Sequence, residues 1–198
     1  MVMQLVHHHR IRWGIVAGTL ASSVVMAIGV PAAHAAVNCV VSAGVTQTAT
    51  TVTGTNGNDT IACGGASRGK KIIGRAGNDT ITGTAFHDTI NGGRGNDTLT
   101  GGGRGDILTG GPGSDTMTGS AGRDTLRGGR GSDTMSGSGG NDVLTGGLGI
   151  DTLSGGGGHD VLKGPANDGR VDTLNGGAGS DACQGPGPDG DTLVSCNP

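Results

Sequence analysis

The chain has 198 residues, of which 45 are Gly and only two, Trp13 and Phe86, are aromatic, and all 16 acidic residues are Asp. This composition excludes a core built on large side chains, although a chain of this length normally forms one domain around such a core. Ordering so many glycines is also entropically costly, so the fold must be stabilised by something other than a usual hydrophobic core, or the chain is disordered.

Residues 1–35 have the order of a secretory signal peptide. A basic start with Arg10 and Arg12 precedes the apolar stretch WGIVAGTLASSVVMAIGV, and PAAHA places Ala33 and Ala35 at an A-x-A cleavage site. We expect cleavage after Ala35, a secreted, extracellular chain, and no membrane span once the signal is removed. The alternative is an uncleaved membrane anchor, since the apolar stretch is nearly long enough to span a bilayer.

The mature chain is mildly acidic. Removing Arg10 and Arg12 with the leader leaves 11 of the 13 Lys and Arg against 16 Asp, a net charge of about −5. Neither a basic stripe nor a set of stacking aromatics is visible in the sequence. We therefore expect no nucleic-acid partner.

All four cysteines lie in the exported part, where an even number indicates two disulfides. Three pairings can be drawn. Cys39 and Cys63 lie at the start of the repeats described next, and Cys183 and Cys196 lie at their far end. We predict the local pairs Cys39–Cys63 and Cys183–Cys196, which would close the two ends.

An Asp recurs every nine residues without a gap across the middle of the chain. The ten residues are Asp79, Asp88, Asp97, Asp106, Asp115, Asp124, Asp133, Asp142, Asp151 and Asp160. An aliphatic residue follows two positions after each Asp, and a Gly opens each unit. A fixed period of this kind dictates the architecture of the whole chain.

Each unit divides into a turn and a strand. GGRGND, residues 92–97, has the composition of a turn, and TLT, residues 98–100, reads as a three-residue strand with Leu99 on one face. Two units make an 18-residue coil. The predicted fold is an all-β parallel β-roll, a solenoid of two parallel sheets over a thin core of Ile, Leu and Met. We expect a cap segment at 36–53, the roll at 54–194 and a C-terminal tail at 195–198.

Stacking the coils places the Asp residues in two columns, with Asp79 above Asp97 and Asp88 above Asp106, about 4.8 Å apart. Bare carboxylates at this spacing repel one another, and a hard divalent cation between them would convert the repulsion into coordination. Calcium accepts about six to eight oxygens from carboxylates and backbone carbonyls, whereas magnesium and zinc suit such a site less. We therefore predict that several Ca²⁺ ions are bound by the ten Asp above. The outer members of the columns, next to short insertions, are Asp59, Asp172, Asp181 and Asp191.

The units GGRGNDTLT, GGPGSDTMT and GGLGIDTLS match the pattern G-G-x-G-x-D-x-U-x. With them the chain resembles the RTX, or hemolysin-type, calcium-binding repeat family. The resemblance covers residues 54–194 and implies a calcium-loaded β-roll. Many family members carry such repeats beside a toxin, protease or lipase domain. Residues 36–198 hold no such domain, so those activities are not carried over and we expect no enzyme.

Several units depart from the pattern. Lys70 stands where an Asp belongs, and its ammonium would remove a ligand and repel a cation, so one column should begin a coil later than the other. Phe86 and Arg104 replace the fourth-position Gly. His87 and His159 are 72 residues apart, four coils, and cannot share a site.

The sequence thus predicts a secreted calcium-binding repeat protein, a structural or interaction module without catalysis, whose extracellular or cell-surface ligand is unknown. The alternative is surface recognition of ice, glycan or cell wall through one sheet. Its outward residues are Thr80, Thr82, Thr98, Thr100, Thr116, Thr118, Thr134, Ser136, Thr152 and Ser154. Such an array resembles the faces of ice-binding β-solenoids, although Thr also simply favours strands.

Overall fold

The structure is a computed structural model that describes residues 39–165, 168–184 and 190–196. The predicted signal peptide, residues 1–35, lies outside these residues. In the described part every regular element is a strand, and none of these residues forms a helix long and apolar enough to cross a membrane.

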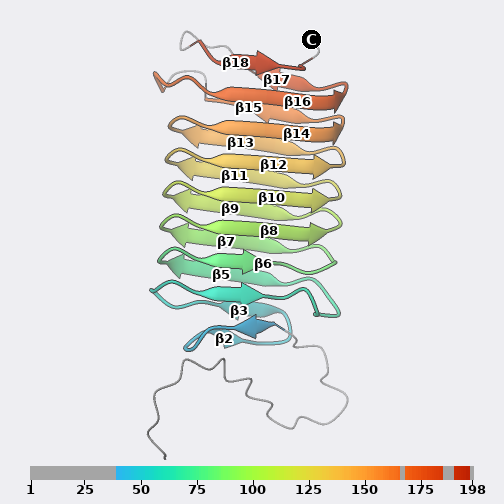
Figure 1. Cartoon of the computed structure of the whole chain (residues 1–198). Coiled ribbons are helices and arrows are strands. Elements are labelled where there is room, and N and C mark those ends of the chain that lie inside the picture. Colours follow the sequence, from blue (N-terminus) through green and yellow to red (C-terminus); the bar gives the residue numbers. More distant parts are fainter. Residues whose placement is uncertain (1–38, 166–167, 185–189, 197–198) are drawn as a thin grey trace, which may run out of the picture.

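From β3 on, successive strands alternate between two nine-stranded sheets that lie face to face along a flattened solenoid (Figure 1). The first sheet consists of β1 (Val40–Val41), β4 (Thr60–Ala62), β6 (Thr80–Thr82), β8 (Thr98–Gly103), β10 (Thr116–Ala121), β12 (Thr134–Gly139), β14 (Thr152–Gly158), β16 (Thr173–Gly179) and β18 (Thr192–Val194). The second sheet consists of β2 (Thr46–Gln47), β3 (Thr51–Thr53), β5 (Lys71–Ala76), β7 (Thr89–Arg94), β9 (Ile107–Pro112), β11 (Thr125–Arg130), β13 (Val143–Leu148), β15 (Val161–Lys163) and β17 (Ala182–Gln184).

The register follows the nine-residue period. Thr116 of β10 pairs in parallel with Thr98 of β8 and with Thr134 of β12, so like positions of successive coils lie side by side. This confirms the predicted all-β solenoid of 18-residue coils with two parallel sheets. The N-terminal end differs, because β1 and β2 pair antiparallel with β4 and β3. Both lie in the predicted cap segment, as does β3, which already pairs in parallel with β5.

From β3 to β16, one apolar side chain per strand fills the space between the sheets. Because polar and apolar residues alternate, the second residue of each of these strands points inward, and Leu99, Leu126 and Leu144 are 0 % exposed. The full row is Val52, Ile61, Ile72, Ile81, Ile90, Leu99, Leu108, Met117, Leu126, Met135, Leu144, Leu153, Leu162 and Leu174. The predicted thin core is therefore confirmed.

The strands are longer than the sequence predicted. Most central strands have six residues, and β8 runs from Thr98 through three glycines to Gly103. The predicted turn GGRGND therefore contracts to residues 95–97, because Gly92, Gly93 and Arg94 still belong to β7. Gly93 takes a φ of 117°, a conformation open to Gly that lets the backbone stay paired as it approaches the bend.

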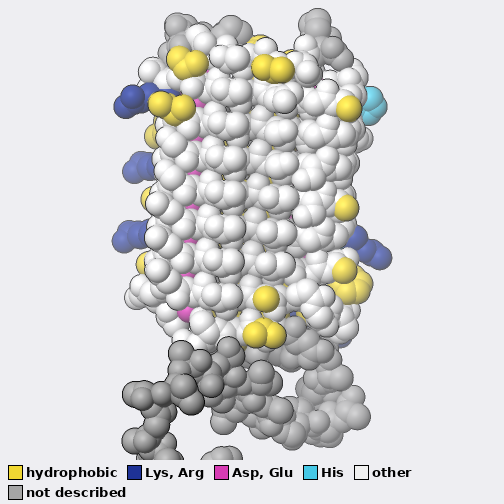
Figure 2. All heavy atoms as spheres, in the orientation of Figure 1, with side chains coloured by type: hydrophobic (Ala, Val, Ile, Leu, Met, Phe, Trp, Pro, Cys, Tyr) yellow, Lys and Arg dark blue, Asp and Glu magenta, His cyan; other side chains and the backbone are white. Residues whose placement is uncertain are grey.

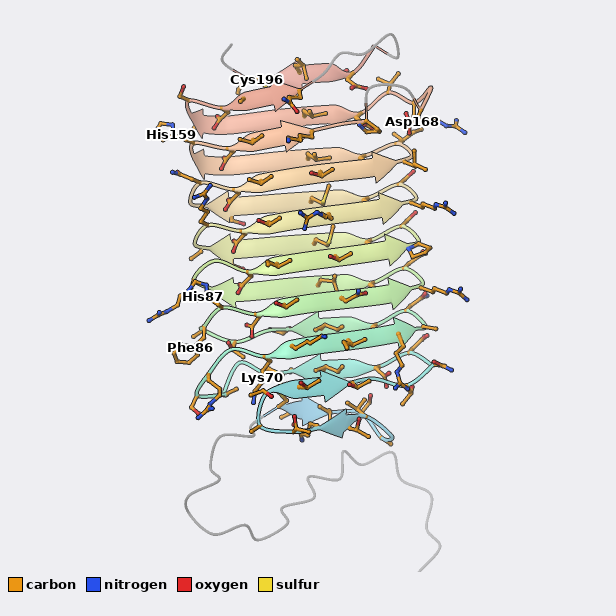
Figure 3. The ribbon with its side chains drawn as sticks, turned by 180° about the vertical axis from the view of Figure 1, so that it is seen from behind. Lys70, Phe86, His87, His159, Asp168 and Cys196 are labelled. Carbon is orange, nitrogen blue, oxygen red and sulfur yellow. A yellow bond between two sulfur atoms is a disulfide. The ribbon has the colours of Figure 1, made fainter. Side chains whose placement is uncertain are left out.

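Disulfides close both ends as predicted. Cys39, just before β1, is bonded to Cys63, just after β4. Cys183 in β17 is bonded to Cys196 after β18, so this bridge joins the last strands of the two sheets (Figure 3). Each bridge therefore ties an end of the solenoid that has no further coil to pack against.

The opening Gly of each unit must lack a side chain. A Cβ on Gly128 would lie 2.2 Å from Asp133 Oδ2 and 2.4 Å from the carbonyl oxygen of Gly146, whereas a Cβ on Gly139 would meet nothing closer than 4.0 Å. We predict that Gly128→Ala lowers the free energy of unfolding by more than about 1 kcal/mol. The matched Gly139→Ala should stay within about 0.5 kcal/mol of wild type. Urea unfolding in calcium measures both, and equal losses would contradict this account.

Candidate metal centre

The predicted Asp residues come together as two ladders. Each, except the last of its ladder, donates its backbone N–H to Oδ1 of the Asp one coil further along, as in Asp97 to Asp115 at 2.8 Å. The first ladder contains Asp59, Asp79, Asp97, Asp115, Asp133, Asp151, Asp172 and Asp191. The second contains Asp88, Asp106, Asp124, Asp142, Asp160 and Asp181. All fourteen side chains are buried.

The short insertions do not interrupt the ladders. Asp151 bonds to Asp172 at 2.8 Å, Asp160 to Asp181 at 2.9 Å, and Asp172 to Asp191 at 3.0 Å. The extra residues lie in the connections between strands, so the outer members keep the geometry of the central ones.

Most of these carboxylates have one oxygen without a hydrogen-bond donor. Oδ1 of each accepts the ladder hydrogen bond, but Oδ2 is buried and has no partner among the described residues. The twelve such oxygens belong to Asp79, Asp97, Asp106, Asp115, Asp124, Asp133, Asp142, Asp151, Asp160, Asp172, Asp181 and Asp191. A buried, unpaired carboxylate oxygen is costly, and a cation is the usual partner that offsets this cost.

The raised pKa values of several ladder carboxylates also indicate that their charged forms lack a partner. Burial, opposed by the ladder hydrogen bond and reinforced by neighbouring carboxylates, raises the pKa of Asp106 and Asp133 to about 7. The same causes raise the pKa of Asp97 to about 6. The charged form of these carboxylates is thus destabilised by its surroundings in the absence of a cation.

Two Asp residues differ because the protein itself supplies donors to both oxygens. Asp59 accepts from Ser42 Oγ at 2.8 Å, and from Thr55 through its N–H at 2.6 Å and its hydroxyl at 3.0 Å. Asp88 accepts at Oδ2 from the N–H and hydroxyl of Thr84, at 2.6 and 2.9 Å. Although burial acts to raise the pKa of Asp59, its hydrogen bonds outweigh burial and lower it. Neither residue needs a cation to satisfy its oxygens.

Lys70 occupies the place of an Asp before the second ladder. The backbone N–H of Lys70, which is labelled in Figure 3, donates to Asp88 Oδ1 at 2.5 Å, and its ammonium donates to the carbonyl oxygen of Ala49. Burial, followed by the charge of Arg68, lowers the pKa of Lys70. The carboxylates of this ladder therefore begin one coil later than those of the first, in keeping with the sequence.

The donors present suit calcium. Within the described ranges, no three side chains of His, Cys or Asp converge on one point. A cation beside either ladder would combine a few carboxylate oxygens with backbone carbonyls, which is the ligand set of Ca²⁺ rather than of Zn²⁺. The unpaired Oδ2 atoms fit such an ion.

Other residues singled out in the sequence are engaged within the edges of the solenoid. Phe86 and His87 lie at the same edge as His159, several coils apart (Figure 3). Each histidine bonds to the turn of the following coil, at Gly105 or Ser180. The two departures at the fourth position meet, because the Arg104 guanidinium lies 5.6 Å from the centre of the Phe86 ring.

Sequence reasoning missed the donors to Asp59 and Asp88. The signal was present, because their units begin GTNGND and GTAFHD, with Thr55 and Thr84 in place of the second Gly. A hydroxyl four residues before the Asp reaches the oxygen that is otherwise unpaired.

The model of the family described as "RTX calcium-binding nonapeptide repeat (4 copies)" matches residues 46–65, 73–108, 100–135, 136–164 and 167–185. A comparison with curated proteins finds no significant match.

The raised pKa values predict how the metal-free chain responds to pH. The folded-state pKa of Asp106 and Asp133 lies near 7, above the ordinary value of 3.8. Their contribution to stability is therefore full below about pH 4 and is lost as the pH rises through about 7. Calcium-stripped protein should show more β-structure by circular dichroism at pH 5 than at pH 8. A signal that is constant, or that grows with pH, would contradict this.

Proposed function

Because the chain belongs to the RTX calcium-binding nonapeptide repeat family, we propose that it is a secreted β-roll folded by several Ca²⁺ ions. It acts as a structural or interaction module without catalytic chemistry. The observation that carries this proposal is the row of twelve buried Oδ2 atoms without a donor. We assign these twelve Asp residues as calcium ligands, and we assign Asp59 and Asp88 as carboxylates held by the protein.

Calcium binding would supply folding free energy that the thin core does not provide. One aliphatic side chain per nine residues buries little apolar area, while the many glycines lose much conformational freedom on folding. The ladders also place buried carboxylates within one strand spacing of each other, where their negative charges repel. A bound cation removes this repulsion only in the folded state, so its binding free energy becomes folding free energy.

Two further features support a secreted, non-catalytic role. The order of residues 1–35 is that of a signal peptide, and the two disulfides suit an oxidising compartment. The repeat also employs its polar side chains structurally, with Asp in the ladders and the side-chain oxygens of Asn58 and Asn78 accepting backbone N–H groups of the next coil.

A second candidate function is recognition of a surface by the first sheet. Eight threonines lie in one unbroken column along it, one per coil, from Thr60 through Thr116 to Thr192. Its strands carry no charged side chain, and in Figure 2 this face is mostly white, with magenta only as a narrow line between columns. Ice, a glycan or cell wall would be the ligand of such an array.

The calcium requirement is tested by chelation. Adding EDTA to the mature, disulfide-bonded protein at neutral pH should abolish its β-sheet circular dichroism, and excess calcium should restore it. Magnesium at the same concentration serves as the control and should restore less, because it tolerates the geometry of mixed carbonyl ligands poorly. A protein that stays fully folded in EDTA would refute calcium-coupled folding.

The ligand assignment is tested by a matched pair of variants in one ladder. Asp115→Asn removes a carboxylate whose Oδ2 is unpaired, whereas Asp59→Asn removes one whose oxygens the protein already satisfies. Loss of even a supporting group costs about tenfold in metal affinity. Asp115→Asn should therefore raise the calcium concentration at the folding midpoint at least about tenfold, and isothermal titration should count fewer ions. Asp59→Asn should leave the count unchanged, and a lower count for it would refute the assignment.

A further inference from the structure

The fold separates the charges of the chain. Fourteen Asp are buried in the ladders, and Asp168 is half-buried with its oxygens accepting the N–H groups of Gly149 and Arg170. Nine of the basic residues are exposed, namely Arg68, Lys71, Arg75, Arg94, Arg104, Arg123, Arg127, Arg130 and Arg170. In the described part of the chain the exterior is thus cationic, although the mature sequence is acidic.

These cations are distributed unequally over the two sheets. The strands of the second sheet contain Lys71, Arg75, Arg94, Arg127, Arg130 and Lys163 and no carboxylate, whereas the strands of the first sheet contain no charged residue. In Figure 2, which faces the first sheet, the dark blue side chains project only from the sides, and magenta shows as a narrow line between white columns. The basic face is therefore the second sheet.

A shallow groove of about 500 Å³ crosses this basic face, lined by residues of β5, β7 and β9 and, at one end, by Asn56. Gly93 and Gly111 form its floor, since their lack of side chains leaves a furrow between neighbouring residue columns. Asn91 and Thr109 line one side, and Arg94 lines the other. The volume lies within the range of about 300–1,000 Å³ that is typical of small-ligand sites.

Arg75 lies towards the N-terminal end of the groove, where only Asn56 of the preceding coil lines it further on. It is in register with Gly93 and has a φ of 91°, a backbone conformation that disfavours side chains. The next two coils have Gly93 and Gly111 at this position, with φ values of 117° and 123°. There is space for a side chain here, because β3 pairs only with residues 71–73 of β5. The charged side chain of Arg75 thus lines the groove at a position whose backbone conformation suits a glycine better.

We propose that this groove, with Arg75 and Arg94 as its charged anchors, binds a short stretch of an anionic polysaccharide. Guanidinium groups recognise carboxylate and sulfate oxygens through paired N–H donors. The amide of Asn91 and the hydroxyl of Thr109 offer hydrogen bonds to sugar hydroxyls between the charges. Arg130 continues the Arg94 side of the groove two coils on, about 10 Å away at the strand spacing, so a linear polyanion meets further charge along the axis.

A polysaccharide fits this face better than a nucleic acid does. The strands of the second sheet contain no aromatic residue on which bases could stack. The site also shares no residue with the Asp ladders, so it extends the proposed function to a ligand class and rests on the calcium proposal only for the folded state.

The experiment uses the mature, disulfide-bonded protein in calcium and compares dextran sulfate with uncharged dextran. Dextran sulfate should bind with an affinity that falls as salt rises, and dextran should not bind. Arg75→Gly and Arg94→Gln should each weaken binding about threefold to fivefold. Each should also lower the slope of log affinity against log salt by about 1. Arg75→Gly installs the residue of the next coil, so its calcium midpoint and melting temperature should not fall.

Arg123→Gln is the matched control, because Arg123 is also exposed but lies just before β11, at the opposite edge of the second sheet from Arg94. It should bind dextran sulfate as wild type does. Equal weakening by Arg123→Gln would show diffuse attraction and overturn the groove. Absence of binding by a folded, calcium-loaded wild type would overturn the proposal outright. Tighter binding of single-stranded or duplex DNA than of dextran sulfate, at equal salt, would overturn the polysaccharide assignment.

Discussion

The structure depends on one hydrogen bond, repeated along both edges, from the backbone N–H of each Asp to Oδ1 of the Asp one coil further on. Donor and acceptor belong to the same kind of residue, so a single Asp per unit sustains the ladder indefinitely. The bond also holds each carboxylate in the buried edge of the solenoid, so close to the Gly that opens the unit that this Gly has no room for a Cβ. The same bond leaves the second oxygen buried and without a donor, and a cation is the partner that would offset the cost of burying it.

In the first coils, protein hydrogen bonds take the place that a cation would have beside Oδ2. Thr55 and Thr84 donate both N–H and hydroxyl to the Asp of their own unit, and Lys70 stands where a further carboxylate would add repulsion. These substitutions lie at the N-terminal end, next to the Cys39–Cys63 bridge. This end is thus held by a disulfide and by hydrogen bonds within the protein, whereas the carboxylates in the middle of the solenoid have no protein donor to Oδ2.

Burying the acidic residues has a consequence for the exterior. The net charge of the mature chain suggests a mildly acidic protein, but nearly all described carboxylates lie inside the wall, and the arginines lie outside it. The two faces then differ, because the first sheet presents threonine columns and the second presents arginines beside a glycine-floored groove. Net charge alone therefore misjudges the kind of partner that such a solenoid can attract.

The nine-residue period by itself determined the coil length, the two parallel sheets, the inward aliphatic row and the order of Asp within each column. A strict period specifies which residues stack, and the positions of Cys39, Cys63, Cys183 and Cys196 at its ends indicated their pairing. The tertiary structure alone decided that the strands extend through Gly92 and Gly93, that one carboxylate oxygen joins the ladder while the other stays unpaired, and that Arg75 faces a groove. These features depend on the positions of atoms one coil away. A repeat pattern identifies neighbouring residues, but it does not show which of their atoms meet or which side chains remain exposed.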